Sequence, residues 1–166
     1  MKKIVLLSDT HGHLDEQILK FCKEADEIWH AGDWGPNVSE GLMDLKITLR
    51  GVYGNIDDAL LRLIYPENNI FTCEGVKVMI KHIGGYPGHY AAGVKIKLAE
   101  EIPAIFISGH SHILKVMRDS SHRNLLHINP GAAGVHGFHK VRTMVNFKID
   151  NGKVFDMNVI ELGARA

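Results

Sequence analysis

The sequence predicts an α/β fold in which two packed sheets are flanked by helices. In residues 1–64, short apolar runs typical of strands alternate with segments of helical periodicity. Beyond residue 69 most segments favour strands. No linker, internal repeat or low-complexity stretch divides the 166 residues, so we expect a single domain over residues 1–166.

The first half reads as three strand–helix units. Each apolar run ends in a turn rich in Gly, Asp or Asn, namely SDTHGH, AGDWGP and GNIDD. Apolar side chains at helical spacing follow, as with Ile18 and Cys22, and the third helix ends before Pro66. The strands are expected at residues 4–7, 27–30 and 47–53, and the helices at residues 14–23, 38–45 and 58–64.

The second half is mostly strands. VKVMIKH alternates with period two, so residues 69–73 and 76–82 are expected to form an antiparallel hairpin. GGYPGH is expected to be a loop, followed by a helix over residues 90–100. Asn151-Gly152 is a strong hairpin signal. The other strands are expected at residues 104–108, 113–118, 123–128, 143–149 and 153–161.

The composition limits the functions that need consideration. Lys and Arg number 19, equal to Asp and Glu, so no basic field favours extended nucleic-acid binding. Cys22 and Cys73 lack CxxC spacing, which predicts reduced thiols. No apolar run approaches the ~20 residues of a membrane span, and the amino terminus is too polar for a signal peptide. We expect a cytoplasmic protein with a small substrate and no membrane contact.

Polar side chains follow five of the predicted strands. The loops are SDTHGH, HAGDWG, YGNID, KHIGG and SGHSH. Turn chemistry explains their Asp, Asn and Gly residues, but turns do not require histidines. Open α/β sheets bind ligands at the carboxyl ends of their strands, so we interpret these loops as a metal centre. The candidate ligands are Asp9, His11, Asp33, Asn55, His82, His110 and His112.

Seven donors exceed the four of a tetrahedral zinc site and the three of a two-histidine, one-carboxylate iron site. A site with two metals that share one ligand accounts better for the seven donors. Mixed nitrogen and oxygen donors suit manganese, iron, cobalt, nickel or zinc rather than magnesium or calcium. Two cations ~3.5–4 Å apart can clamp a transferring phosphoryl group, so hydrolysis of phosphate esters is the favoured reaction.

These motifs resemble those of the calcineurin-like metallophosphoesterases. D-x-H begins at residue 9, G-D at residue 32, G-N at residue 54 and G-H-x-H at residue 109, with His82 ending a strand between the last two. The short chain and NPG at residues 129–131 are similar to the YfcE-type phosphodiesterase subgroup. The resemblance implies a four-layer α/β/β/α sandwich with a dinuclear site at the sheet ends.

The resemblance also implies roles for the seven residues. Asp9, His11 and His112 would bind one metal, Asn55, His82 and His110 the other, and Asp33 would bridge them. A metal-bridging hydroxide would attack phosphorus, with Asp33, Asn55 and His11 as catalytic residues. Two divalent ions are implied, with manganese the first choice and iron, nickel, cobalt or zinc as alternatives. Gly109 is expected to let the backbone turn so that His110 and His112 reach different metals.

One position departs from the family pattern. Many relatives have a histidine after the Asn of G-N, where this chain has Ile56, and isoleucine can neither donate a proton nor stabilise an oxyanion. The subgroup also lacks this histidine, so we expect activity on phosphodiesters with good leaving groups rather than on alkyl monoesters. His89 is a candidate substitute proton donor.

Other polar and aromatic residues receive weaker assignments. His13 is expected to start a helix or line the cleft, and His30 and Asp57 to support the ligands. NPGAAG at residues 129–134 is expected to be a structural turn. Trp29 is expected to pack in the core, and Trp34 to border the cleft. Roles for His127, His136 and His139 stay open.

A non-catalytic protein-interaction scaffold is the alternative function, as in the retromer subunit that shares this fold. That relative's pattern has lost metal-site residues, whereas all seven are present here. The physiological substrate stays open, as does the formation of a homo-oligomer.

Overall fold

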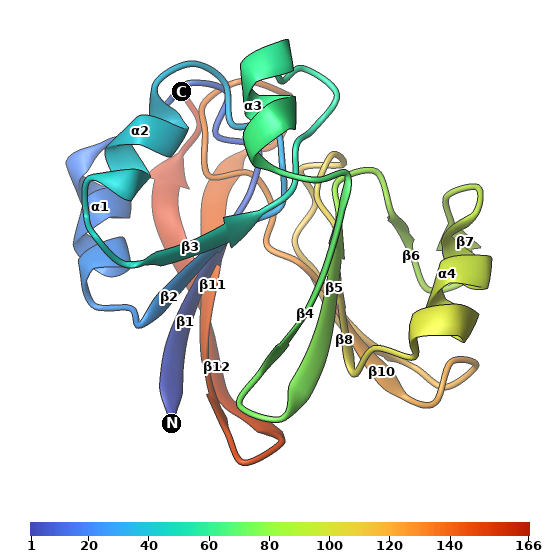
Figure 1. Cartoon of the computed structure of the whole chain (residues 1–166). Helices are drawn as coiled ribbons and strands as arrows, with labels where there is room; N and C mark the ends of the chain where they lie inside the picture. Colours follow the sequence, from blue (N-terminus) through green and yellow to red (C-terminus); the bar gives the residue numbers. More distant parts are fainter.

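The structure, a computed structural model, describes all residues 1–166 and contains two five-stranded mixed sheets packed face to face (Figure 1). The first sheet has the order β12-β11-β1-β2-β3. β1, β2 and β3 are parallel, and β11 is antiparallel to both β1 and β12. Its strands are β1 (Lys2–Leu7), β2 (Glu27–His30), β3 (Thr48–Gly51), β11 (Val141–Asp150) and β12 (Lys153–Ala164).

The second sheet has the order β4-β5-β8-β10-β9. β5, β8 and β10 are parallel, and an antiparallel strand lies at each edge. Its strands are β4 (Asn68–Cys73), β5 (Val76–Lys81), β8 (Ile105–Ile107), β9 (Lys115–Asp119) and β10 (Leu125–Asn129). The predicted hairpin of β4 and β5 is confirmed, with Cys73 opposite Val76 at its turn.

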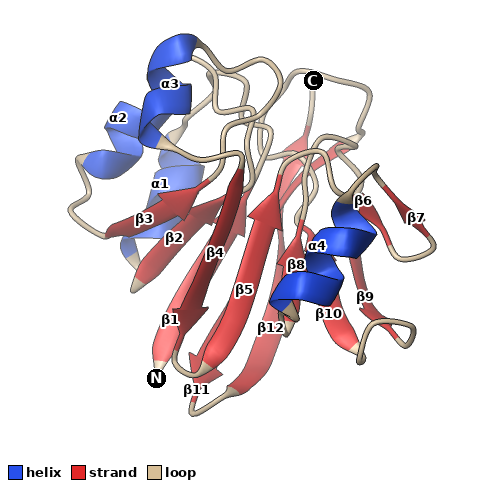
Figure 2. Cartoon of the chain, turned by 45° about the vertical axis from the view of Figure 1, so that its right-hand side comes forward, coloured by secondary structure: helices blue, strands red, loops and turns tan.

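Helices cover the outer faces of the two sheets, which confirms the four-layer α/β/β/α sandwich. α1 and α2 lie against the first sheet, and α4 lies beyond the second (Figures 1 and 2). Asp15 caps α1 by accepting a hydrogen bond from the Ile18 N–H, 2.9 Å away. The helices are α1 (Glu16–Lys23), α2 (Val38–Met43), α3 (Ala59–Ile64) and α4 (Val94–Glu101).

Three apolar clusters hold the layers together. The largest lies between the sheets and includes Leu6, Ile80 and Ile107, which are fully buried. A second packs α1 and α2 onto the first sheet through Ile18 and Leu42, and the smallest packs α4 onto the second sheet. Side chains at alternate positions of a strand reach opposite faces, so each sheet contributes to two clusters.

The predicted loop GGYPGH and the start of the next helix were wrong. Residues 85–90 form a small hairpin of β6 (Gly85–Tyr86) and β7 (His89–Tyr90). The helix therefore begins at Val94 and not at residue 90, after Gly93 with a φ of +82°. β6 and β7 have two residues each, which is too short for the alternation of apolar and polar residues that identifies a strand in a sequence. The Gly- and Pro-rich segment therefore indicated only a turn.

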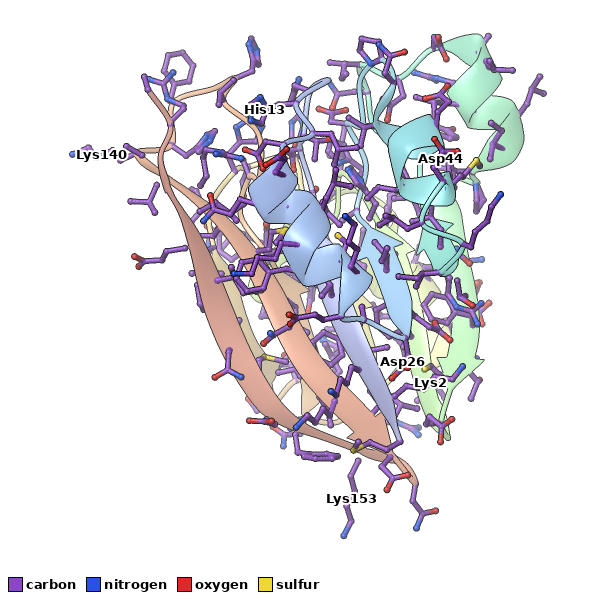
Figure 3. The ribbon with its side chains drawn as sticks, turned by 90° about the vertical axis from the view of Figure 1, so that its left-hand side faces the viewer. Lys2, His13, Asp26, Asp44, Lys140 and Lys153 are labelled. Atoms are coloured by element: carbon purple, nitrogen blue, oxygen red, sulfur yellow. The ribbon has the colours of Figure 1, made fainter.

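The fold gathers the ends of several parallel strands along one edge. In Figure 1 the loops that follow β1, β2, β5 and β8 meet along the upper edge, while the amino terminus and the β11–β12 turn lie below. Figure 3 likewise shows His13 at the upper end of α1 and Lys153 at the opposite end of the molecule. None of the four helices has the length and apolar character that a membrane crossing requires. Cys22 and Cys73 are buried free thiols.

Candidate metal centre

The upper loops bring all seven candidate ligands together in two groups. In one, the ligating atoms of Asp9, His11 and His112 lie within 4.8 Å of one another, and Asp33, His82 and His110 form a second group by the same measure. Nε2 of His112 is 3.2 Å from Oδ1 of Asp9, and Nε2 of His11 is 3.9 Å from that oxygen. Ligands about 2.1 Å from one cation lie about 3–3.5 Å apart, so the 3.2 Å separation suits a shared ion, and the 3.9 Å separation is slightly longer than that range.

Asp33 lies between the two groups. Its Oδ2 is 3.4 Å from Nε2 of His11 and 3.3 Å from Nε2 of His82, so a single oxygen faces both. Its Oδ1 accepts a hydrogen bond from the Ile56 N–H at 3.1 Å, which fixes the orientation of the carboxylate.

Asn55 joins the second group. Its Oδ1 lies 3.1 Å from Nε2 of His82 and 3.0 Å from Nδ1 of His110. Nδ1 of His82 donates to the backbone carbonyl of Ala31 at 2.7 Å, so this histidine presents Nε2 as its free donor to the site.

Three glycines allow the loops to approach this closely. A Cβ at Gly54 would lie 2.1 Å from Oδ1 of Asp33, and one at Gly32 would lie 2.6 Å from Nδ1 of His82. At Gly109 it would lie 2.2 Å from Oγ of Ser8, on the other sheet. Glycine is therefore needed at position 109 because the two sheets approach closely there, and not because of a left-handed backbone. In this loop it is His110 and His112 that have left-handed conformations.

Five of the seven candidate ligands have left-handed backbone conformations. Such conformations are uncommon outside glycine and cost about 1–3 kcal/mol each, and they cluster at functional sites. Surrounding contacts hold them in place, such as the hydrogen bond from the His110 N–H to Oδ2 of Asp9 at 3.1 Å. The five are Asp9 (φ 53°), His11 (φ 45°), Asp33 (φ 57°), His110 (φ 68°) and His112 (φ 61°).

Asp57 supports the loops, as predicted. Its two carboxylate oxygens accept hydrogen bonds from the backbone N–H groups of Trp34, Gly35 and Gly54, at 2.7–3.2 Å. One carboxylate thus ties the loop after β2, which carries Asp33, to the loop after β3, which carries Asn55.

His30 also supports the loops, and the prediction for Trp34 was wrong. Trp34 is fully buried and donates to the Val52 carbonyl at 2.8 Å, so it does not border the cleft. His30 stacks on it with ring centroids 3.9 Å apart and contacts Oγ1 of Thr10 at 3.0 Å. Complete burial lowers the pKa of His30 to about 3. Trp29 packs in the core, as predicted.

The electrostatics of the site suit cations. Oδ1 of Asp9 and Nε2 of His11 are buried without a hydrogen bond, an arrangement that is costly unless another partner fills the space. Burial raises the pKa of Asp9, but the neighbouring His112 and His82 imidazoles outweigh it and hold the pKa below its usual range. Burial lowers the pKa of His11. Burial opposes protonation of His82, but its contact with Asp33 and the charge of Asp9 outweigh burial and raise its pKa. Divalent metals bind ionised carboxylates and neutral imidazole, so a cation would compete with the proton at His82.

An open cleft of about 500 Å³ leads to these residues. Its wall includes Asn55, His110 and the half-exposed Ile56, so the position where relatives have a histidine does face the cleft. The fully exposed Phe138 forms part of the rim.

Two histidines from a loop whose role the sequence left open also line the cleft. The His136 ring lies 4.7 Å from that of His11, and the His139 ring lies 5.2 Å from that of His112. The strand-end pattern missed these two histidines because they lie seven and ten residues beyond the end of β10, after NPGAAG, and not directly at the strand end. The only signal in the sequence was the spacing of VHGFHK.

The remaining assignments divide between structural and unassigned roles. His13 contacts Oδ2 of Asp15 at 2.9 Å, at the start of α1. NPGAAG is structural, because Asn129 donates to the Gly109 carbonyl and Gly134 donates to that of Asp9. His89 is exposed on β7 and does not line the main cleft.

Comparisons with known proteins identify a family for this chain. Residues 1–152 match the calcineurin-like phosphoesterase superfamily domain. A probable metallophosphoesterase from Mycoplasma pneumoniae is 27% identical over 163 residues, covering 95% of this chain and 96% of the relative.

Solved structures share the fold. A predicted phosphoesterase from Streptococcus pneumoniae superposes with a TM-score of 0.67 at 21% identity, covering 96% of this chain and 97% of that one. Vps29 from Entamoeba histolytica, solved with zinc, superposes with a TM-score of 0.72 at 14% identity, covering 96% of this chain and 98% of that one.

Proposed function

Because this chain belongs to the calcineurin-like phosphoesterase superfamily, we propose that it is a dinuclear metal-dependent phosphodiesterase of the YfcE type. Its substrates are small phosphate esters, it acts in the cytoplasm, and manganese is its first-choice metal. The observation that carries the proposal is the position of Asp33, whose Oδ2 lies within 3.4 Å of a histidine from each ligand group.

The donor set fits two divalent cations. Asp9, His11 and His112 would hold one, and Asn55, His82 and His110 the other, with Asp33 shared. When bound, such a pair acidifies water and neutralises charge on a phosphoryl group. Only two carboxylates offset the four positive charges, so the site keeps an excess that attracts an anionic ester.

The protein's own residues then define the reaction. The Ile56 N–H and the Asp57 carboxylate fix Asp33 and its loop, so the ligands need little reorganisation. Ile56 supplies no proton to the departing oxygen, and the exposed His89 is outside the main cleft. Esters whose leaving group departs as a stable anion are therefore favoured, which means aryl diesters over alkyl monoesters.

A scaffold function of the Vps29 kind is the competing proposal. It is supported by the shared fold, but fold alone does not carry function. Buried, unpartnered donors such as Oδ1 of Asp9 and Nε2 of His11 support a metal site. Vps29 was itself solved with zinc, so ester hydrolysis and not metal binding separates the two functions.

The test is metal reconstitution followed by a substrate screen. Metal-free protein is loaded with manganese, iron, nickel, cobalt or zinc, bound ions are counted, and aryl diesters are compared with alkyl monoesters. We expect two ions per chain and faster diester turnover. Binding of two ions without hydrolysis of any ester would favour the scaffold, and oxygen-dependent turnover alone would contradict both functions.

Asp33→Asn provides the matched variant. We expect kcat to fall about a hundredfold or more, because residues that merely orient metal ligands are already worth 10–100-fold. Asp44→Asn, at an exposed carboxylate at the end of α2, is the control and should leave kcat unchanged (Figure 3). Full activity in Asp33→Asn would overturn the dinuclear mechanism.

A further inference from the structure

A second, smaller pocket adjoins the cleft on the side of the β6–β7 hairpin. It has a volume of about 200 Å³, and we call it the hairpin pocket. His110, Ser111 and Ile113 line both spaces, so a molecule with its phosphate at the candidate metal centre could extend into it. Whole small-molecule sites are about 300–1,000 Å³, so this pocket suits one part of a substrate. The lining residues used below are Tyr86, His89, Ser111, Lys115 and His127.

His127 is the unusual residue of the hairpin pocket. It lies on β10, facing α4 rather than the other sheet, and its side chain is fully buried beside the Phe106 ring, 5.6 Å away. Neither of its ring nitrogens makes a hydrogen bond of good geometry, and the nearby Phe106 backbone only partly offsets the effect of burial on its pKa. Buried polar side chains are nearly always hydrogen-bonded, and leaving one unpaired costs about 1–3 kcal/mol. A ligand in the pocket would supply the missing partner.

The charge state of His127 restricts what that ligand is. Burial lowers the pKa of His127 to about 4, so the imidazole is neutral at pH 7. A neutral imidazole offers one N–H donor and one acceptor nitrogen. The complementary group carries an acceptor and a donor side by side.

The other lining groups add donors and aromatic surface. Oγ of Ser111 accepts from the Ile113 N–H and from Nδ2 of Asn129, which leaves its own hydrogen free to donate. Nζ of Lys115 lies 3.8 Å from the Tyr86 ring centroid, and the rings of Tyr86 and His89 are 4.9 Å apart. The lining includes no Asp or Glu. The pocket therefore suits a flat, acceptor-rich ring.

We propose that the hairpin pocket binds one ester group of the diester, a planar heterocycle with carbonyl acceptors and an N–H such as a pyrimidine base, and that His127 determines this specificity. The proposal rests on the phosphodiesterase function and adds a substrate class to it. His127 is not a catalytic residue, because it lies outside the ligand cluster.

The kinetic test uses two substrates that release the same p-nitrophenolate. One is the p-nitrophenyl ester of thymidine 5′-monophosphate, and the other is p-nitrophenyl phenylphosphonate, whose ring has no hydrogen-bonding groups. We expect the wild type to prefer the thymidine ester. His127→Leu should reduce that preference at least about tenfold through KM, the effect of 1–2 hydrogen bonds, with kcat for the phosphonate unchanged.

Two further variants separate recognition from structure. His127→Gln keeps a donor and an acceptor and should restore part of the preference. His122→Leu, the same substitution at a histidine of the β9–β10 turn outside the pocket, should leave it intact. Equal changes for both substrates in His127→Leu, or no preference in the wild type, would overturn the proposal.

Binding of thymidine to the metal-free protein distinguishes a failure of the proposed phosphodiesterase function from a failure of the hairpin-pocket assignment. Thymidine, which has no phosphate, is titrated while the imidazole ¹⁵N signals of His127 are followed by NMR. We expect these signals to shift at millimolar thymidine even if no ester is hydrolysed. If neither ester is turned over and no shift is seen, the pocket assignment is overturned. If neither ester is turned over but the signals shift, the pocket assignment stands and only the proposed phosphodiesterase function is contradicted.

Discussion

The cleft and the hairpin pocket share a wall, yet they are built from opposite chemistry. In the cleft, two ionised carboxylates and four imidazoles are crowded so closely that donor atoms lie 3.2–3.9 Å apart. In the hairpin pocket no carboxylate is present, and a buried imidazole has no partner. The first region concentrates negative charge, and the second offers aromatic rings and hydrogen-bond donors, including the Lys115 ammonium.

This difference separates two requirements of an esterase. Binding and activating a phosphoryl group requires charge that is held in place before the substrate arrives. Recognising the organic part of an ester requires hydrogen-bonding groups that are left free until it arrives. Variants that affect one region and leave the other intact can test this division.

The largest effect is expected from Gly109→Ala, which pushes the two sheets apart at the cleft. The new methyl group would lie 2.2 Å from Oγ of Ser8 and 2.8 Å from Oδ2 of Asp9. We expect the free energy of unfolding to fall by about 3 kcal/mol, as for overpacked cores. Metal affinity should fall by about 10–100-fold. Denaturant unfolding and metal titration measure the two effects.

Gly88→Ala is the control for Gly109→Ala. A Cβ at Gly88 would meet nothing within 4 Å, but its φ of +87° strains any other residue. We expect a loss of about 1–2 kcal/mol from that strain, with metal affinity unchanged. A similar loss of metal affinity in both variants would show that close approach of the sheets is not what assembles the cleft.

A smaller effect on the same region is expected from Asp57→Asn. The amide that replaces one carboxylate oxygen cannot accept, so at least one backbone N–H of Trp34, Gly35 or Gly54 loses its partner. We expect a loss of about 2 kcal/mol in stability and a fall in kcat of about tenfold. Asp58→Asn is the control, because Asn caps a helix as well as Asp does. An unchanged kcat in Asp57→Asn would contradict the role of Asp57 in positioning the two loops.

The sequence predicted the cleft because each of its ligands lies in a short motif at a strand end. Apolar runs located the strands, and parallel strands bring their carboxyl ends to one edge. Trp34 was misplaced because adjacency to Asp33 in sequence does not say which way a side chain points. The hairpin pocket was not predicted, because Tyr86, Lys115 and His127 come from three separate segments whose meeting depends on packing.

The cleft wall at Ile56 can be altered without replacing any of the seven proposed metal ligands. Ile56→His places a proton donor where the half-exposed isoleucine faces the cleft. We expect kcat for alkyl monoesters to rise about tenfold, the lower end of general-acid catalysis because the position is not otherwise adapted. Ile56→Phe introduces a ring without a proton, and an equal gain in that variant would contradict the explanation.

The smallest effect at neutral pH is expected in the hairpin pocket, and its sign is opposite to those in the cleft. His127→Leu replaces an unpaired buried imidazole by an apolar side chain, so the free energy of unfolding should rise by about 1 kcal/mol at pH 7. A protein that becomes more stable while it loses substrate preference has given up a group retained for binding.

Acid should enlarge the gain from His127→Leu. Burial lowers the pKa of His127 to about 4, below the usual 6.5, so between these values the unfolded wild type binds a proton that the folded protein does not. Wild-type stability therefore decreases as the pH is lowered through this window, by up to about 1.4 kcal/mol per pH unit, and the leucine variant lacks that loss. Urea unfolding from pH 7 to pH 4 measures the difference. A constant difference across this range would mean that folding does not change the protonation of His127, which would contradict a buried neutral imidazole in the hairpin pocket.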